Sequence, residues 1–334
     1  MRIAVIDCGT NTFNLLIADP VSSVPEVWKT VFTNKIPVKL GEGGFLSKEI
    51  VTSRFVRGID ALYCHSHNIS NYECQRVHAF ATSAIREASN GKEFQQKAKE
   101  IAGIEIEIID GNREAELIFR GVKQTIELDE KPVLVMDIGG GSTEFIIANS
   151  AGILWKKSFL LGVSRLHEKI QPQERLTQED SRNLTYEMDN GLTDLKAALA
   201  IHAPKRLVGT SGSFDTLFSL FLFGRKKESA STSSLLNEIP LTALPSIHAW
   251  LAGSSLDERL KHPAIPAIRA QYMPLASFFI KYVLDLQPLE KVYHSAYSLK
   301  EGAMAEIISA MDLTTVHSAT DLLSGDEDMS GKPI

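Results

Sequence analysis

One pattern occurs twice in the chain, at a constant offset of 130 residues. The stretch 6–12 (IDCGTNT) is followed by the apolar run 15–18, and the stretch 136–142 (MDIGGGS) is followed by the apolar run 145–148. Each copy predicts a buried strand that ends in a turn of small residues, followed by a second buried strand. A long-period repeat of one such unit indicates two similar domains, each beginning with this hairpin.

The rest of each half mixes helices and strands, which predicts an α/β fold. The predicted strands are 76–81, 104–109, 152–160 and 206–208, and the predicted helices are 52–68, a short one from Ser83, 91–102, 113–123, 178–201 with Thr177 as its cap, and most of 214–310. This division places the first domain at 1–126, the second at 127–310, a loop at 224–237 and a solvated tail at 311–334.

Composition narrows the class of protein. The 334 residues suit two domains, at ~100–200 residues each. A formal net charge of -6 argues against a general nucleic-acid-binding protein. No apolar run approaches the ~18–20 residues of a membrane-spanning helix. The three cysteines lack a CxxC spacing and indicate neither a disulfide framework nor a zinc site. We therefore expect a cytoplasmic protein without nucleic-acid or membrane partners.

Three turns of small residues are candidates for phosphate binding. Successive backbone N–H groups in such turns form concave sites for anionic oxygens, and glycine lets a phosphate approach the main chain. A single glycine-rich turn is usually only a turn, but three of one kind strengthen the prediction. The predicted phosphate-binding residues here are Gly9, Thr10, Asn11, Thr12, Gly139, Gly140, Gly141, Ser142, Thr210, Ser211 and Gly212.

Two aspartates, Asp7 and Asp137, end the first strand of each hairpin. Such a carboxylate often only caps the N–H groups of its turn. Alternatively, the pair holds a divalent cation, because Mg²⁺ binds few protein carboxylates and keeps several waters. Glu144 begins the strand after the second turn and is expected to point toward the same region.

Further charged residues have both a structural and a functional interpretation. Glu114 lies in the first turn of a predicted helix, where a glutamate commonly only interacts with the helix dipole. An ionised carboxylate there also meets the requirement for a base that activates water. Arg86 and Arg269 are either solvated charges or phosphate ligands. Histidines such as His294 lack metal-ligand spacing and are expected to be structural or surface residues.

These motifs together resemble a known family. The stretches 6–13, 81–87, 111–118, 137–144 and 209–212 are similar, in order, to those of the Ppx/GppA family of exopolyphosphatases and guanosine-pentaphosphate phosphatases, within the actin-like ATPase superfamily. The stretch 295–302 also resembles the family's closing helix, and the whole resemblance covers roughly residues 1–310. It implies two actin-like (ribonuclease H-like) domains with the active site in the cleft between them. It also implies hydrolysis of a terminal phosphoanhydride, assisted by Mg²⁺ or Mn²⁺.

The resemblance also implies roles for individual residues. Glu114 falls on the family's catalytic glutamate, which deprotonates water. Asp137 and Glu144 fall on acidic residues near the metal and the water, and Asp7 is a second candidate metal ligand. Arg86 falls on an arginine that contacts the phosphate chain. Family members commonly form homodimers, and polyphosphate or guanosine pentaphosphate is the expected substrate.

The chain departs from the family pattern on one side of the expected pocket. Where the family often has Arg-Ala-Asp, this chain has Arg269 followed by Ala270 and Gln271, and Ala276 stands where glycine is expected. Arg269 itself remains available as a phosphate ligand. Larger members also carry a C-terminal helical extension, and the lack of it here predicts a preference for short polyphosphate.

Four functions are consistent with the sequence. The first is a short-chain exopolyphosphatase in which water activated by Glu114 attacks in line, and the second is a guanosine pentaphosphate 5′-phosphatase. An actin-like ATP-dependent kinase would leave Glu114 without a task. A non-catalytic sensor of polyphosphate or alarmone nucleotides is disfavoured by the presence of both Glu114 and Asp137. The apolar stretch 217–223 predicts a core helix rather than a dimer interface.

Overall fold

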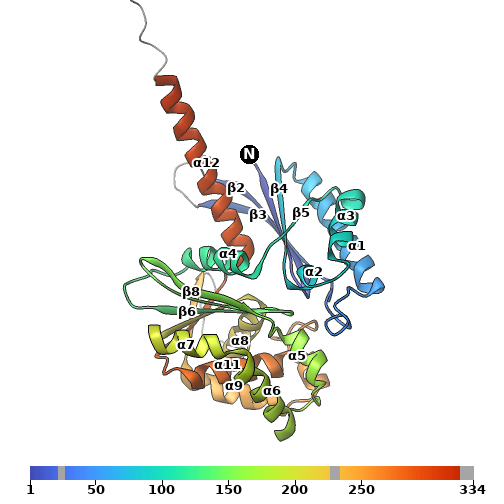
Figure 1. Ribbon diagram of the computed structural model, residues 1–334, viewed down its shortest axis with the longest axis vertical. Helices are drawn as coiled ribbons and strands as arrows, with labels where there is room; N and C mark the ends of the chain where they lie inside the picture. The colour runs from blue at the N-terminus through green and yellow to red at the C-terminus, as the bar shows by residue number, and fades with distance from the viewer. Residues whose placement is uncertain (22–26, 226–233, 324–334) are drawn as a thin grey trace, which may run out of the picture.

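Two sheets, each covered by helices, make up the protein. The computed structural model describes residues 1–21, 27–225 and 234–323, with side chains up to Met311. The first sheet has the strand order β3-β2-β1-β4-β5, and the second has the order β10-β11-β9-β6-β7-β8. Figure 1 shows one sheet above the other, with helices on both sides of the pair. This arrangement confirms the predicted α/β class.

The elements follow the two halves of the chain. The first sheet and its helices comprise β1 (Ile3–Cys8), β2 (Thr12–Pro20), β3 (Trp28–Pro37), α1 (Thr52–Asn71), β4 (Arg76–Ala81), α2 (Ser83–Arg86), α3 (Gly91–Ala102), β5 (Ile106–Ile108) and α4 (Gly111–Lys123). The second comprises β6 (Val133–Ile138), β7 (Thr143–Asn149), β8 (Gly152–Phe159), α5 (Val163–Ile170), α6 (Gln178–Gly191), α7 (Thr193–His202), β9 (Arg206–Thr210), α8 (Ser211–Gly224), β10 (Leu236–Ile239), α9 (Leu244–Gly253), α10 (Leu256–Lys261), α11 (Met273–Leu286), β11 (Lys291–Ser295) and α12 (Leu299–Leu323).

The repeat seen in the sequence is also present in the strand pairing. Ile3 of β1 lies opposite Ala18 of β2 and opposite Arg76 of β4. Each of these residues has a counterpart 130 positions later that pairs in the same way, namely Val133, Ala148 and Arg206. The register irregularity after Ile17 recurs after Ile147. Three strands of each sheet therefore follow the repeat, not only the two of the hairpin.

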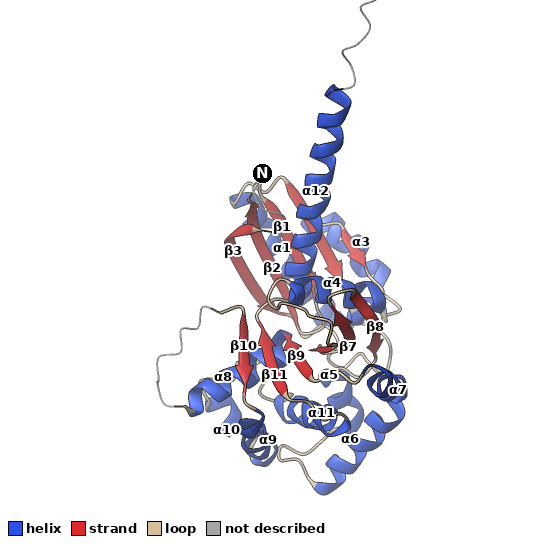
Figure 2. Ribbon diagram, turned by 90° about the vertical axis from the view of Figure 1, so that its left-hand side faces the viewer, coloured by secondary structure: helices blue, strands red, loops and turns tan. Residues whose placement is uncertain are grey.

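Three hydrophobic cores hold the layers together. In the first, between the first sheet and the helices α1 and α3, Phe13 packs edge-to-face on Phe94. In the second, between the second sheet and the helices below it, Phe145 packs on Phe279 of α11. The third core is shared, because α4 and α12 lie between the two sheets and bury side chains against both (Figures 1 and 2). It fixes how the sheets face each other.

The prediction of one continuous helix over 178–201 is wrong. The stretch 178–201 forms two helices, α6 and α7, which are separated at Leu192. Thr177 caps α6 as predicted, in a capping box with Asp180. The break places the buried Leu192 in the core, and a Cβ on Gly191 would lie 2.8 Å from Leu161 Cδ1. Burial at this bend prevails over the helical periodicity that continues through it.

Further differences lie near the C-terminal end. The stretch 214–310, expected to be mainly helical, also contains β10 and β11. Both strands are too short to stand out from their helical neighbours. Helix α12 continues to Leu323, so 311–323 is helical where we expected a solvated tail. Of the predicted loop 224–237, residues 226–233 lie outside the described residues. No helix in the described ranges is long and apolar enough to cross a membrane.

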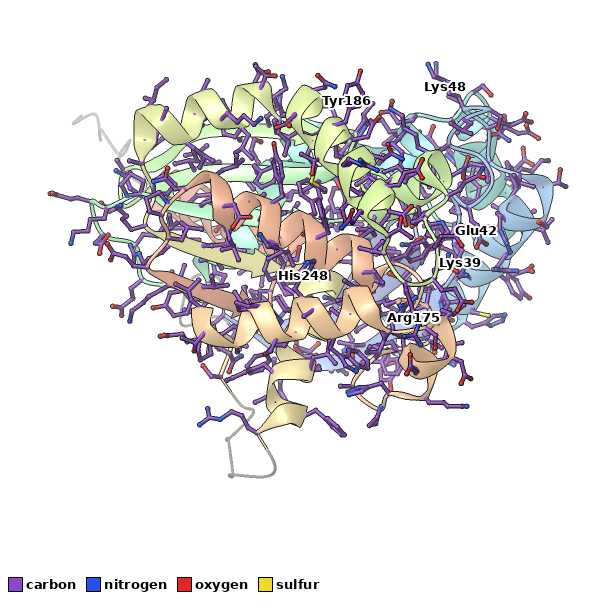
Figure 3. The ribbon with its side chains drawn as sticks, turned by 90° about the horizontal axis from the view of Figure 1, so that it is seen from below. Lys39, Glu42, Lys48, Arg175, Tyr186 and His248 are labelled. Carbon is purple, nitrogen blue, oxygen red and sulfur yellow. The ribbon has the colours of Figure 1, made fainter. Side chains whose placement is uncertain are left out.

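Helix α5 of the second domain contacts the first domain. Glu168 accepts hydrogen bonds from the backbone N–H groups of Gly43 (2.9 Å) and Leu46 (3.1 Å). One turn earlier, Ser164 Oγ donates to Asn11 Oδ1 across 3.0 Å. Figure 3 looks onto the helices of the second domain, with the 39–48 region of the first domain at their side. These contacts join the domains at one edge of the space between them.

Candidate active site

The two repeated turns face each other across a cavity between the domains. The cavity encloses about 180 Å³ and is lined by both turns, by the third predicted turn and by several charged side chains. A Cβ on Gly140 would lie 2.8 Å from both Cγ2 of Thr10 and Nδ2 of Asn11. Only glycine therefore lets the second turn approach the first so closely. Of the predicted phosphate-binding residues, those that line the cavity are Gly9, Thr10, Asn11, Thr12, Gly139, Gly140, Gly141, Ser142, Ser211, Gly212 and Arg269.

The two hairpin turns share one backbone geometry. The N–H of Gly9 donates to the carbonyl of Thr12 over 3.1 Å, and the N–H of Gly139 donates to the carbonyl of Ser142 over 3.0 Å. The two hydrogen bonds join residues that correspond at the 130-residue offset of the repeat. The two turns thus present equivalent backbone surfaces to one cavity.

Each residue of the third turn, 210–212, makes a different contact. Ser211 has a left-handed backbone (φ 63°), and its hydroxyl donates to Asp137 Oδ2 over 2.6 Å. A Cβ on Gly212 would collide with the guanidinium of Arg269, so glycine there lets Arg269 keep its position. The hydroxyl of Thr210 instead donates to the carbonyl of Tyr297 (2.7 Å) and lies outside the cavity. Thr210 therefore stabilises the turn without lining the cavity.

Asp7 and Asp137 both line the cavity. Asn14 Nδ2 donates to Asp7 Oδ2 over 3.0 Å. Asp137 Oδ2 accepts from the hydroxyls of Ser211 and Ser298, each at 2.6 Å. Removal from solvent raises the pKa of Asp7 to about 6 and also raises the pKa of Asp137. Two carboxylates from opposite domains therefore share one poorly solvated site, which disfavours their negative charges.

This pair suits a divalent cation that keeps much of its water. Among the described residues no group of three or more His, Cys, Asp and Glu side chains is arranged around a common metal position. The pKa of Asp7 is raised partly by the charge of Asp137, and a cation between them would relieve that repulsion. Mg²⁺ characteristically binds through one or two carboxylates together with water and substrate phosphates. Asp7 and Asp137 therefore fit Mg²⁺ better than a metal held by protein ligands alone.

Glu114 lines the cavity from the first turn of α4. The helix begins there because Asp110 Oδ1 accepts from the N–H of Arg113 at 2.8 Å. Arg86 Nη1 donates to Glu114 Oε2 over 2.7 Å and to the carbonyl of Ile109 over 3.1 Å. Burial raises the pKa of Glu114 to about 7, although the Arg86 guanidinium opposes this shift. A carboxyl group with such a pKa exchanges protons readily near neutral pH.

Arg86 itself is placed differently from the expectation. Its side chain is not among those that line the cavity. The guanidinium instead holds Glu114 and the carbonyl of Ile109, and its Nε lies 3.2 Å from Glu87. Arg86 thus fixes the orientation of Glu114.

Glu144 completes an acidic row across the second sheet. It pairs with Asp137 of β6 on one side and with Ser158 of β8 on the other. Ser158 Oγ donates to Glu144 Oε1 over 2.6 Å. Burial, followed by the charges of Glu114 and Asp137, raises the pKa of Glu144 well above its ordinary value. Glu144 is therefore favoured in its protonated form.

Several residues of the cavity were not identified from the sequence. The polar and charged ones include Asn14, Lys35, Asp215, Ser298 and Lys300. Lys300 lies at the start of α12, in the stretch 295–302, whose similarity to the family assigned it no role. Asp215 and Lys35 come from segments with no motif of their own, so only the tertiary structure brings them to the site. Gln271, where the family pattern is broken, is not among the lining residues, whereas its neighbour Tyr272 is.

Comparison with known proteins identifies the family. The model of the Ppx/GppA phosphatase family matches residues 18–310. The chain belongs to this family. It is 35% identical to a crystal structure described as an exopolyphosphatase from Cytophaga hutchinsonii, with a TM-score of 0.89, over 93% of this chain and 98% of that one. An Aquifex aeolicus Ppx/GppA family structure, at 21% identity and a TM-score of 0.76 over 93% of this chain and 99% of that one, shares the fold.

Two curated sequences extend the comparison. A Haemophilus influenzae protein, provisionally named an exopolyphosphatase, is 24% identical over 96% of this chain and 95% of its own length. A guanosine-5′-triphosphate,3′-diphosphate pyrophosphatase from Photobacterium profundum is 27% identical over 92% of this chain, which spans 59% of that protein. The predicted α/β fold and the predicted class of enzyme, a phosphoanhydride hydrolase, are confirmed at the level of the family.

Proposed function

We propose that the protein removes the terminal phosphate of short inorganic polyphosphate. Water attacks the terminal phosphorus, the bond from that phosphorus to the bridging oxygen breaks, and orthophosphate and a chain one unit shorter leave. Phosphoryl transfer of this kind depends mainly on positioning and on stabilisation of the spreading negative charge. The cavity offers both, since two turns of backbone N–H groups and Arg269 surround it.

Glu114 is the base in this proposal. Its carboxylate lies in the cavity wall, Arg86 fixes its orientation, and its pKa of about 7 suits proton uptake from water. Asp7 and Asp137 would hold Mg²⁺, which supplies charge neutralisation to the phosphate oxygens when bound. Glu144, protonated, would donate a hydrogen bond in the same region.

The observation that carries the proposal is the position of Glu114 beside both phosphate turns. A kinase of the same fold has no need of a water-activating carboxylate there, and a sensor has no need of one that is oriented by an arginine. Hydrolysis of guanosine pentaphosphate remains the second candidate, supported by the similarity to the Photobacterium profundum enzyme.

The test is phosphate release, measured with malachite green, from tripolyphosphate, long polyphosphate, guanosine pentaphosphate and ATP, each with and without Mg²⁺. The highest kcat/KM on tripolyphosphate supports the proposal, whereas a higher value on guanosine pentaphosphate assigns the second function. Tight binding of every compound without turnover would establish the sensor instead. Glu114→Gln is the control for contaminating phosphatases.

The remaining proposals concern assembly and location. We propose that the protein is a cytoplasmic homodimer, because members of the family commonly form homodimers. Helix α8 gives little support for an interface, because Leu217 and Leu220 are buried in the core of the second domain. Light scattering on the purified protein measures the oligomeric state directly.

A further inference from the structure

Two cross-strand rows, one on each sheet, lie at the cavity, and all of their residues except Ser158 line it. In the first domain the row runs from Asp7 on β1 through Asn14 on β2 to Lys35 on β3. In the second domain the equivalent row runs from Asp137 through Glu144 to Ser158. Adjacent strands lie about 4.8 Å apart, so each row reaches roughly 10 Å from its aspartate. One row ends in a cation, and the other consists of acids and a hydroxyl.

The elements that carry Glu114 and Lys35 give the cavity two ends. Glu114 is influenced by Arg86, Asp137 and Asp7. Lys35 is influenced by Arg269, Lys300, Asp215 and also Asp7. Asp7 is the residue common to both sets. Lys35 lies on β3, two strands from Asp7 at the edge of the first sheet. Glu114 lies on α4, which packs against β7 and β8 of the second sheet. The two residues therefore mark different ends of the cavity.

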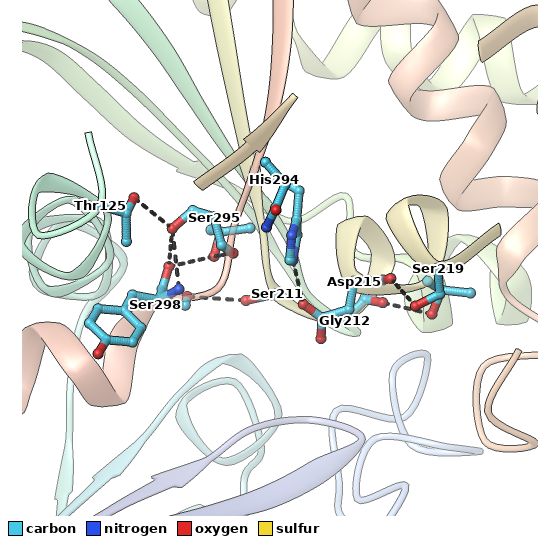
Figure 4. A network of polar contacts seen from close by, with 12 residues as sticks. Thr125, Ser211, Gly212, Asp215, Ser219, His294, Ser295 and Ser298 are labelled. Atoms are coloured by element: carbon cyan, nitrogen blue, oxygen red, sulfur yellow. Dashed lines mark hydrogen bonds and ion pairs between the residues drawn. The ribbon is translucent and has the colours of Figure 1, made fainter. Parts of the chain in front are cut away.

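At the Lys35 end the guanidinium of Arg269 is held in place by its neighbours. Arg269 Nη1 donates to Thr216 Oγ1 over 3.0 Å, and its Nη2 lies 3.3 Å from Asp215 Oδ2. Asp215 Oδ1 in turn accepts from His294 Nε2 at 3.0 Å (Figure 4). Although burial opposes it, this hydrogen bond and the charge of Arg269 hold the pKa of Asp215 below its ordinary value. His294 and Asp215 are thus positioning residues for Arg269.

Lys35 differs from Arg269 because it has no protein partner. It makes neither an ion pair nor a side-chain hydrogen bond within the described part of the chain, yet it lines the cavity and is exposed there. Neighbouring protein atoms exclude solvent from its ammonium group. This effect, followed by the charge of Arg269, lowers its pKa to about 8, so the group remains mostly charged at neutral pH. An unpaired cation beside two others is stabilised when an anion binds between them.

We infer that Lys35, with Arg269, binds the phosphate groups behind the one that is removed. The chain then lies with its terminal phosphate at Glu114 and its remainder directed toward β3. This inference rests on the proposed function and gives the substrate a direction in the cavity. Lys35 is a binding residue in this arrangement and does not touch the reacting atoms.

The test compares Lys35→Gln with Lys29→Gln, which removes the same charge from an exposed position on the same strand. We expect Lys35→Gln to raise KM for tripolyphosphate about tenfold, as for loss of one charge-assisted contact. We expect kcat to change less than about twofold. Lys35→Arg should restore most of the affinity, and Lys29→Gln should resemble the wild type.

Two results would overturn the inference. One is a Lys35→Gln variant whose KM matches that of Lys29→Gln, and the other is a fall in kcat with KM unchanged. Calorimetric titration of tripolyphosphate into the same proteins separates the two proposals. If the wild type binds tripolyphosphate without releasing phosphate, the proposed function fails, and weaker binding by Lys35→Gln still supports the role of Lys35.

Discussion

Arg86 and Glu114 form an ion pair in which Nη1 and Oε2 are 2.7 Å apart, although 28 residues separate them in the chain. Arg86 ends the short helix α2, and Glu114 lies in the first turn of α4. The residue Glu114 is 6% exposed, so this contact joins a nearly buried carboxylate to a cation that does not itself line the cavity. The pair supports a base whose orientation and proton affinity are set by its neighbour.

Glu114→Gln is expected to lower kcat by about 10²–10⁴-fold, because the amide cannot take a proton from water. The KM for tripolyphosphate should change little, since the turns and cations that hold the phosphates remain. Steady-state kinetics and the melting temperature of the same preparation check both points. Near-normal turnover in a folded variant would reject Glu114 as the base.

The pH dependence should report the protonation of Glu114. Its pKa is about 7 and the ionised form is the active one, so kcat/KM should rise with pH up to about 7 and then level off. Arg86→Gln removes the cation that favours ionisation, so the acid limb should move to higher pH. An unchanged limb in Arg86→Gln would mean that a different group controls it. Residual activity of Glu114→Gln should lack the limb.

Glu144→Gln should stabilise the protein at pH 8. The folded-state pKa of Glu144 is raised, so this residue favours folding below its unfolded pKa and loses that contribution as pH rises through the folded value. The neutral amide removes the penalty, which is about 1.4 kcal/mol for each tenfold difference in proton affinity between the folded and unfolded states. Melting temperatures should increase by about 2–4 °C per kcal/mol at pH 8 and hardly at all at about pH 4, below the unfolded-state pKa. Equal gains at both values would contradict this account.

The sequence predicted those features that depend on residues close together in the chain. Each hairpin is a local unit, so its strands, turn and terminal aspartate followed from about a dozen consecutive residues. The contribution of Lys35 could not be assigned, because it comes from a third strand and the order of strands in a sheet is set by tertiary packing. The same limit applies to Arg86, whose contact with Glu114 depends on how α2 lies beside α4.

Part of the repeat is hidden in the sequence. The strands 76–81 and 206–208 were both predicted, and their starts differ by the same 130 positions as the hairpins. Their similarity is not visible in the sequence, because the corresponding residues share burial and strand pairing but not residue type. Conversely, the sequence around Leu192 has no combination of glycine and proline that would predict the end of a helix. It has a single glycine within a continuing amphipathic pattern. There, packing of a nonlocal core determined the outcome.

Helix α5 closes one edge of the cavity, so we expect Glu168 to affect substrate affinity. Glu168→Ala removes the acceptor for two backbone N–H groups, those of Gly43 and Leu46, which weakens the closed arrangement of the domains. KM for tripolyphosphate should rise about 3- to 10-fold, and protease cleavage near residues 41–47 should become faster. Glu187→Ala is the matched control, because Glu187 pairs with Lys169 within the second domain. If both variants behave alike, the contact has no part in closing the cavity.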